Sequence, residues 1–160
     1  MAIDRDEFRA TMGQFCTGVV IATGAPDGVP AGFAAQSFVS LSLEPPLIAL
    51  SPAKTSSSWP KLRAAGSFCI NVLGADQQAL CSHFARSGGD KFTVLDWRAG
   101  TNGAPRLDGV IAYIECELHE EVDAGDHTIA IGRVTHIERS ADAKRPLLFF
   151  QGGYGEFAAF

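Results

Sequence analysis

The chain has 160 residues, 46% of them hydrophobic and 19% charged, which fits one folded domain over residues 1–160 and excludes a disordered chain. Its 13 basic and 18 acidic residues leave a net charge of −5, which argues against nucleic acid or an anionic membrane as the main partner, because both attract a basic face. No apolar run approaches the roughly 20 residues of a membrane-spanning helix and no signal peptide is recognisable, so we predict a cytoplasmic protein.

A short helix is the first predicted element. Asp4 and Glu7 have the spacing of a capping box, in which two side chains satisfy free backbone N–H groups at the start of a helix. Phe8, Met12 and Phe15 follow about one turn apart. We therefore expect an amphipathic helix whose apolar residues form a stripe along one side.

Most of the following elements are predicted to be strands. β-Branched residues predict a strand over residues 17–23, and residues 25–28 contain the Pro, Asp and Gly typical of a turn. Further strands are expected over residues 37–43, 47–50, 67–73, 110–118, 128–137 and 147–150. Short helices are expected over residues 60–65, ending at Gly66, and over residues 75–84. Many short strands and few helices favour a β-barrel, and no G-x-G-x-x-G motif follows a strand as a Rossmann fold would require.

The sequence lacks the motifs of metal-dependent and nucleophile-dependent enzymes. The four cysteines have apolar or small neighbours and form no C-x-x-C pair, so we predict reduced core residues at Cys16, Cys69, Cys81 and Cys116. The four histidines are scattered, and none belongs to a ligand motif; they are His83, His119, His127 and His136. We therefore predict no metal site.

Three segments could bind a ligand, and each also has a purely structural interpretation. Residues 51–58 contain five hydroxyls and the Lys54 ammonium, which suit a phosphate but also a solvated turn. Residues 32–38 are small enough for a flat ligand to approach the backbone, yet they could simply lead into a strand. In residues 125–128, Asp126 could orient His127 at the mouth of a pocket, or the segment could be an ordinary hairpin turn.

These segments, in this order, resemble the short-chain flavin reductases, the NAD(P)H:flavin oxidoreductase components of two-component monooxygenases. The resemblance covers residues 8–157 and rests on F-C-T-G-V-V at 15–20, G-F-A-A-Q-S-F at 32–38, and residues 42–47, 51–59, 68–73, 90–92, 125–127 and 145–150. The chain is especially similar to reductases whose oxygenases hydroxylate phenolic rings, including those of steroid catabolism. Gln151 departs from the family pattern, in which a basic residue is more common at that place.

The resemblance implies a mainly β fold, namely a flavin-binding split β-barrel of Greek-key-like topology with a few short helices. It implies hydride transfer from NADH, or less readily NADPH, to FMN or FAD without a catalytic side chain, and it implies a homodimer and a flavin-dependent oxygenase partner. The flavin-binding residues that it implies are Ala34, Ala35, Gln36, Ser37, Phe38, Ser51, Lys54, Thr55, Ser56, Ser57, His83, Phe84, Lys91 and Phe92. The implied NAD(P)H-binding residues are Asp126, His127 and Tyr154.

Two other functions stay open at this point. One is a non-catalytic flavin-binding split barrel for storage or sensing, which would share the serine-rich loop but have no use for residues 125–127. The other is a relative of the pyridoxamine-phosphate oxidases, which would need a stronger basic cluster than Lys54 alone. Nothing in the sequence identifies an adenine pocket, so the choice between FMN and FAD is open as well.

Overall fold

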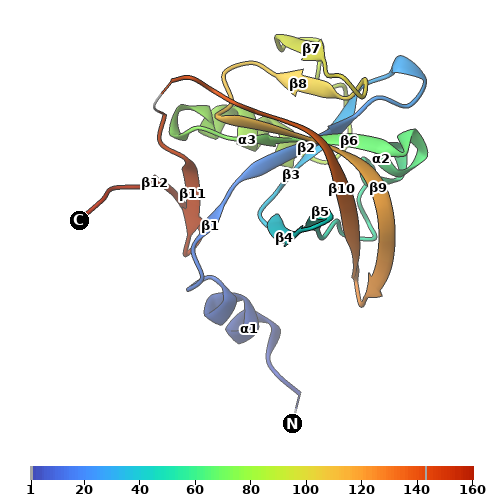
Figure 1. Ribbon diagram of the computed structural model, residues 1–160. Helices are drawn as coiled ribbons and strands as arrows, with labels where there is room; N and C mark the ends of the chain where they lie inside the picture. Colours follow the sequence, from blue (N-terminus) through green and yellow to red (C-terminus); the bar gives the residue numbers. More distant parts are fainter. Residues whose placement is uncertain (1, 143) are drawn as a thin grey trace.

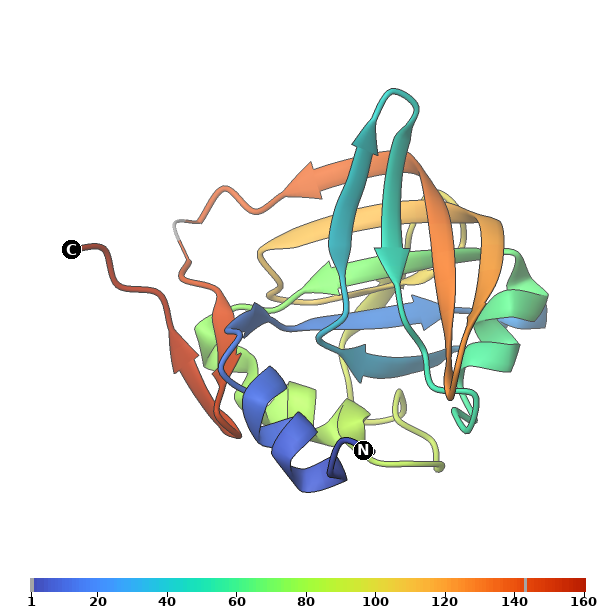
Figure 2. The same cartoon turned by 90° about the horizontal axis from the view of Figure 1, so that it is seen from below.

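The largest unit of the fold is a seven-stranded antiparallel sheet that curls into a barrel (Figure 1). The structure, a computed structural model, describes residues 2–142 and 144–160. The strands lie in the order β3 (Ala31–Ala35), β2 (Val20–Gly24), β6 (Ser67–Val72), β9 (Ala112–Ala124), β10 (His127–Arg139), β5 (Pro46–Leu50) and β4 (Val39–Leu43). Although β3 and β4 follow one another in sequence, they are the two edges of this sheet, and no pairing joins them within the described residues. The barrel is therefore split between β3 and β4 (Figure 2).

Two small sheets and several short helices complete the fold. β1 (Thr17–Gly18), β11 (Leu147–Phe150) and β12 (Gly153–Glu156) form one sheet, and β7 (Trp97–Ala99) pairs with β8 (Pro105–Leu107) at the top of Figure 1. The helices are α1 (Arg5–Met12), α2 (Trp59–Ala65) and α3 (Gln78–Ala85), with 3₁₀ turns η1 (Pro26–Gly28) and η2 (Ala75–Gln77). None of the helices in the described part of the chain has the length and apolar character needed to cross a membrane.

The predicted mainly β barrel is confirmed, and so are most of its elements. The strand expected over residues 147–150 coincides with β11, and α2 ends as expected at Gly66. This glycine adopts the left-handed conformation, with φ of 70°. The conformation has little energetic cost for glycine, because glycine has no Cβ atom.

The structure also corrects several predicted strands. The strand expected over residues 17–23 is broken at Val19, because β1 pairs with β11 whereas β2 pairs with β3 and β6. The strand expected over residues 37–43 begins only at Val39, because the preceding residues cross the split. β3, β7, β8 and β12 were not predicted, and β9 and β10 are longer than predicted because they continue into an exposed polar hairpin.

Helix α1 begins as predicted but packs differently. The Asp4 carboxylate accepts hydrogen bonds from the backbone N–H groups of Asp6 and Glu7, each at 3.0 Å. No residue of α1 is buried, and its side chains Phe8 and Met12 are about half exposed. The helix projects from the barrel (Figure 1), so about half of each of these apolar side chains stays uncovered by the described chain.

Three of the four cysteines lie in the core, as predicted. Cys69, Cys81 and Cys116 are buried among apolar side chains, and burial raises the pKa values of Cys69 and Cys116 to about 12. The prediction is wrong for Cys16, which is exposed because the chain between α1 and β1 leaves the core. All four are free thiols.

A buried ion pair fixes the end of the barrel that lies opposite the β9–β10 hairpin. The Arg106 Nε atom of β8 lies 2.5 Å from a carboxylate oxygen of Glu115 in β9, which is fully buried. The Arg106 Nη1 atom also lies 2.6 Å from Glu138 in β10. Burial raises the pKa of Glu115, but hydrogen bonds from Thr101 and Arg106 and the Arg106 charge outweigh it, so the net pKa is lowered. Glu115 is therefore ionised in the folded protein at neutral pH.

Substitution of Glu115 by Ala should strongly destabilise the fold, because it leaves the Arg106 guanidinium without its buried partner. The expected loss in the free energy of unfolding is about 3–5 kcal/mol. Denaturant titration followed by circular dichroism measures it. Glu117→Ala, at an exposed position of the same strand, is the matched control and should change stability by less than about 0.5 kcal/mol. Equal stability of the two variants would contradict a structural role for the pair.

Candidate functional site

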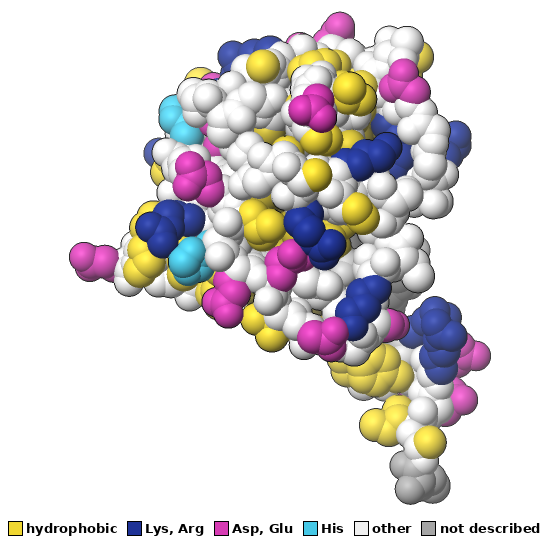
Figure 3. Space-filling model, turned by 90° about the vertical axis from the view of Figure 1, so that its right-hand side faces the viewer, with side chains coloured by type: hydrophobic (Ala, Val, Ile, Leu, Met, Phe, Trp, Pro, Cys, Tyr) yellow, Lys and Arg dark blue, Asp and Glu magenta, His cyan; other side chains and the backbone are white. Residues whose placement is uncertain are grey.

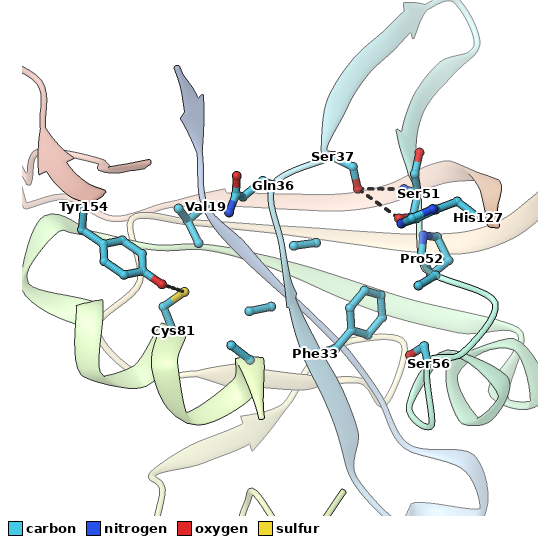
Figure 4. A pocket seen from close by; sticks show the side chains of 14 residues that line it. Val19, Phe33, Gln36, Ser37, Ser51, Pro52, Ser56, Cys81, His127 and Tyr154 are labelled. Carbon is cyan, nitrogen blue, oxygen red and sulfur yellow. Dashed lines mark hydrogen bonds between the residues drawn. The ribbon is translucent and has the colours of Figure 1, made fainter. Parts of the chain in front are cut away.

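A cavity of about 430 Å³ opens beside the split in the barrel (Figure 4), and we call it the split cavity. Residues 33–37, from β3 and the chain that leaves it, form one wall. Ser51, Pro52, Ala53 and Ser56, which follow β5, form the opposite wall. Cys81 and Tyr154 lie at one end, and His127 lies at the other.

The two walls are joined by one serine. The Ser37 hydroxyl oxygen accepts a hydrogen bond from the backbone N–H of Ser51 at 2.9 Å and lies 3.4 Å from the Ser51 carbonyl oxygen, to which it can donate (Figure 4). This contact links the chain leaving β3 to the chain leaving β5. It therefore spans the place where β3 and β4 fail to pair.

The β9–β10 hairpin holds the second wall and positions the histidine. The Lys54 N–H donates to the Asp126 carbonyl at 2.9 Å, and the Thr128 N–H donates to the Pro52 carbonyl at 3.0 Å. His127 Nδ1 lies 2.7 Å from the Asp126 carboxylate. A hydrogen bond from His127, together with its charge, lowers the pKa of Asp126. Because Asp126 occupies Nδ1, the imidazole presents Nε2 to a ligand.

The other end of the cavity contains two weakly polar groups. The Tyr154 hydroxyl lies 3.4 Å from Cys81 Sγ, and the Tyr154 ring packs edge-to-face on Phe149 with ring centroids 5.1 Å apart. The hydrogen bond with Cys81 and burial raise the pKa of Tyr154, so the phenol stays protonated at neutral pH. Cys81 and Tyr154 come from segments 73 residues apart, and no local pattern in the sequence indicated that they meet.

Eight of the predicted residues line this cavity; they are Ala34, Ala35, Gln36, Ser37, Ser51, Ser56, His127 and Tyr154. Asp126 lies directly behind His127. Val19, Phe33, Pro52, Ala53, Cys81 and Ala85 also line it, and the sequence analysis named none of them as a ligand contact, although Phe33, Pro52 and Ala53 lie within its candidate segments. Most of these are apolar or small side chains that are indistinguishable from core residues in the sequence.

The remaining predicted residues lie outside the split cavity. Thr55 is exposed, and Phe38 lies in a groove beside α1. The Lys54 ammonium forms an ion pair with Asp123, so its charge is turned toward the hairpin. Ser57 lines a different cavity, together with Lys91 and Phe92.

His83, Phe84, Lys91 and Phe92 pack the segment after α3 against the barrel. The Lys91 ammonium donates hydrogen bonds to the carbonyls of Gly32 at 3.2 Å and Phe84 at 3.0 Å, and His83 Nε2 lies 2.9 Å from the Lys91 carbonyl. Phe84 and Phe92 are buried, with ring centroids 5.3 Å apart. These contacts hold the loop after α3 against β3 and α3.

Two sequence signals also have structural explanations. The Ser56 hydroxyl accepts from the N–H groups of Ser58 and Trp59 at 3.3 and 3.1 Å, which fixes the turn that leads into α2. A Cβ atom at Gly32 would lie 2.8 Å from the Ala22 carbonyl oxygen and 3.0 Å from the Phe84 ring. Packing against β2 and α3 is therefore sufficient to explain this glycine.

Comparison with known proteins identifies the family. A family model described as "Flavin reductase like domain" matches residues 12–158. The chain is 49% identical over 153 residues to the reductase subunit HsaB of a flavin-dependent monooxygenase from Rhodococcus jostii (strain RHA1), which covers 96% of this chain and 78% of that protein.

Solved structures support the same family assignment. The structure is similar to nitrilotriacetate monooxygenase component B from Mycobacterium thermoresistibile, with a TM-score of 0.94 and 44% identity over 97% of this chain and 87% of that one. It is also similar to the NADH:FAD oxidoreductase SgcE6 of Streptomyces globisporus in complex with NAD and FAD fragments, with a TM-score of 0.89 and 37% identity over 97% of this chain and 93% of that one. These matches confirm the predicted fold.

Proposed function

The chain belongs to the flavin reductase-like family, and we propose that it is an NADH-dependent flavin reductase that binds the flavin ring in the split cavity. The observation that carries this assignment is the character of the cavity walls. Among the described lining residues, only Cys81, His127 and Tyr154 are ionisable, and the two walls contain none. Such walls orient a ring but carry no side chain that could transfer a proton to it, which suits a reaction in which the bound cofactors exchange a hydride.

The residues present fit a flavin. The cavity volume of about 430 Å³ lies within the range of small-molecule pockets, about 300–1,000 Å³. Ala34 and Ala35 leave room for a flat ring, while Gln36 and Ser37 offer polar contacts to its edge. When flavin and dihydronicotinamide are bound, they supply the electron acceptor and the hydride. The chain contributes the stacking geometry that brings them together.

We assign the phosphate nearest the ring to the serine-rich wall. Ser51 and Ser56 line the cavity, and their hydroxyls suit phosphate oxygens. Lys54 stands nearby in sequence, but its ammonium is paired with Asp123. We therefore assign the first phosphate to the hydroxyls and backbone N–H groups of this wall, with no direct contact from Lys54.

The direct test is flavin-dependent oxidation of NADH. The purified chain, mixed in air with NADH and either FMN or FAD, should consume NADH catalytically, and omission of the flavin should abolish consumption. NADH left intact in the presence of both flavins would overturn the proposal. It would instead favour the non-catalytic flavin-binding alternative.

His127 is proposed to hold the nicotinamide through its carboxamide, and not to transfer a proton. The substitution His127→Ala should therefore raise the KM for NADH about fivefold, the equivalent of one hydrogen bond of about 1 kcal/mol, and lower kcat less. Steady-state kinetics with NADH as the varied substrate measures both constants. His119→Ala, at an exposed position of β9 that does not line the cavity, is the control. An unchanged KM in His127→Ala would contradict the assignment.

We further propose that the chain forms a homodimer through the groove beside α1. This groove has a volume of about 970 Å³ and is lined by apolar side chains that include Phe8, Met12, Phe38 and Val39. Figure 3 shows hydrophobic side chains exposed on the projecting N-terminal arm. Exposed apolar surface of this extent is typical of an interface, and β4 beside it is an edge strand.

The double substitution Met12→Lys, Val39→Lys should convert the dimer into a monomer, because it places two charges in the groove. Light scattering after size exclusion measures the mass, and the natural chain should have twice the mass of one chain. Val94→Lys, at an apolar side chain that is 77% exposed outside the groove, should leave the dimer intact. A monomeric natural chain would contradict the proposal.

The proposed physiological partner is a flavin-dependent oxygenase that receives the reduced flavin, by analogy with the monooxygenase subunits among the relatives. We place both proteins in the cytoplasm. Free buried thiols such as Cys69 and Cys116 are typical of that reducing compartment.

A further inference from the structure

The β9–β10 hairpin carries His127 beyond the strand that supports it. The ladder between β10 and β5 ends at the pair of Ala130 and Leu50, three residues short of His127. Figure 2 shows the tip of the hairpin beside the chain that leads from β5 into α2. The backbone hydrogen bonds of the tip reach only residues 52–54 of that chain, which belong to no helix or strand. The place of His127 therefore depends on what else holds the hairpin.

One side chain attaches the hairpin to a helix. The Glu121 carboxylate of β9 lies with Oε2 2.7 Å from Arg63 Nε of α2. Its Oε1 accepts hydrogen bonds at 2.9 Å from Arg63 Nη2 and from the Trp59 indole N–H. A guanidinium that binds both oxygens of a carboxylate fixes its orientation as well as its distance. Glu121 is paired with Ala130 in the hairpin, so this contact acts where the support from β5 ends.

The carboxylate is ionised in the folded protein. The Glu121 side chain is 25% exposed, and burial raises its pKa. Hydrogen bonds from Arg63 and Trp59 and the Arg63 charge outweigh that effect, so the net pKa of Glu121 is lowered. The contact with α2 is therefore present at neutral pH.

Trp59 connects this contact to the split cavity. The Trp59 side chain is buried and packs edge-to-face on Phe33, with ring centroids 6.3 Å apart. Its backbone N–H donates to the Ser56 hydroxyl at 3.1 Å. Phe33 and Ser56 line opposite walls of the split cavity. One buried residue thus touches both walls and, through Glu121, the hairpin that carries His127.

We propose that Glu121 is a positioning residue for NADH, because its contacts with Trp59 and Arg63 hold the hairpin where His127 reaches the nicotinamide. The inference rests on the proposed function, since it takes His127 to bind the carboxamide. Glu121 does not line the split cavity, so it acts through the hairpin. Without it the tip would occupy several positions, and the apparent affinity for NADH would fall in proportion to the fraction that remains competent.

The substitution Glu121→Ala should raise the KM for NADH about fourfold, which corresponds to a competent position kept about one quarter of the time. The constant kcat should change less, and the dissociation constant for FMN should change less than about twofold, because the walls keep their own contacts through Ser37 and Ser56. Steady-state kinetics and flavin fluorescence quenching measure these constants. Glu120→Ala, at the exposed neighbouring position, is the matched control and should leave the KM unchanged.

Two further variants separate positioning from a general loss of stability. Glu121→Gln keeps an oxygen that accepts from Trp59 and Arg63, so it should restore most of the affinity for NADH. Because Glu121 acts through His127, the substitution Glu121→Ala should raise the KM no further when His127→Ala is already present. A variant that only loosened the fold would raise the KM by the same factor in both backgrounds.

An unchanged KM in Glu121→Ala would overturn the proposal, and so would equal increases with and without His127. Neither result bears on the proposed function, which fails only if the natural chain leaves NADH intact with both flavins.

Discussion

The structure depends on one constraint: the barrel cannot close between β3 and β4. Strand β4 is paired with β5, and β3 with β2, so the chain must cross from one edge to the other without a ladder of hydrogen bonds. An unpaired edge exposes backbone donors and acceptors. In this protein the hydroxyl of Ser37 bridges the crossing to Ser51, and Lys91 covers the Gly32 carbonyl of the edge strand. Residues 33–37, which lie between these two contacts, line the split cavity.

The opposite end of the barrel is closed by buried polar contacts. Asn71 of β6 donates to the Ile21 carbonyl at 3.1 Å and accepts from the Leu107 N–H at 2.8 Å, while Thr23 donates to the Pro105 carbonyl at 2.5 Å. These bonds tie β8 to β2 and β6, and the Arg106–Glu115 pair ties it to β9. The sheet is thus fixed at one end, which lets the split end tolerate an incomplete ladder. A site whose task is to hold two rings in register requires such a rigid support.

Local sequence patterns predicted those features of the fold that depend on residues close together in the chain. The Asp4 cap, the end of α2 at Gly66 and the apolar strand at β11 all depend on residues within one or two turns, and all are present. Strand β3 was missed because its small residues have little strand preference, and it forms through pairing with β2. The positions of the lysines were also beyond local reasoning. Asp123 lies 69 residues from Lys54, and Gly32 lies 59 residues from Lys91, so no local pattern could show which groups of the chain these ammonium groups contact.

The chemistry of the split cavity suits reversible binding of a ring. The split cavity is open and mostly apolar, with hydroxyl groups but no unpaired ammonium, so a ring bound there can leave again after reduction. A dissociation constant in the micromolar range corresponds to about 8 kcal/mol, which a few hydrogen bonds and one stacked ring can supply.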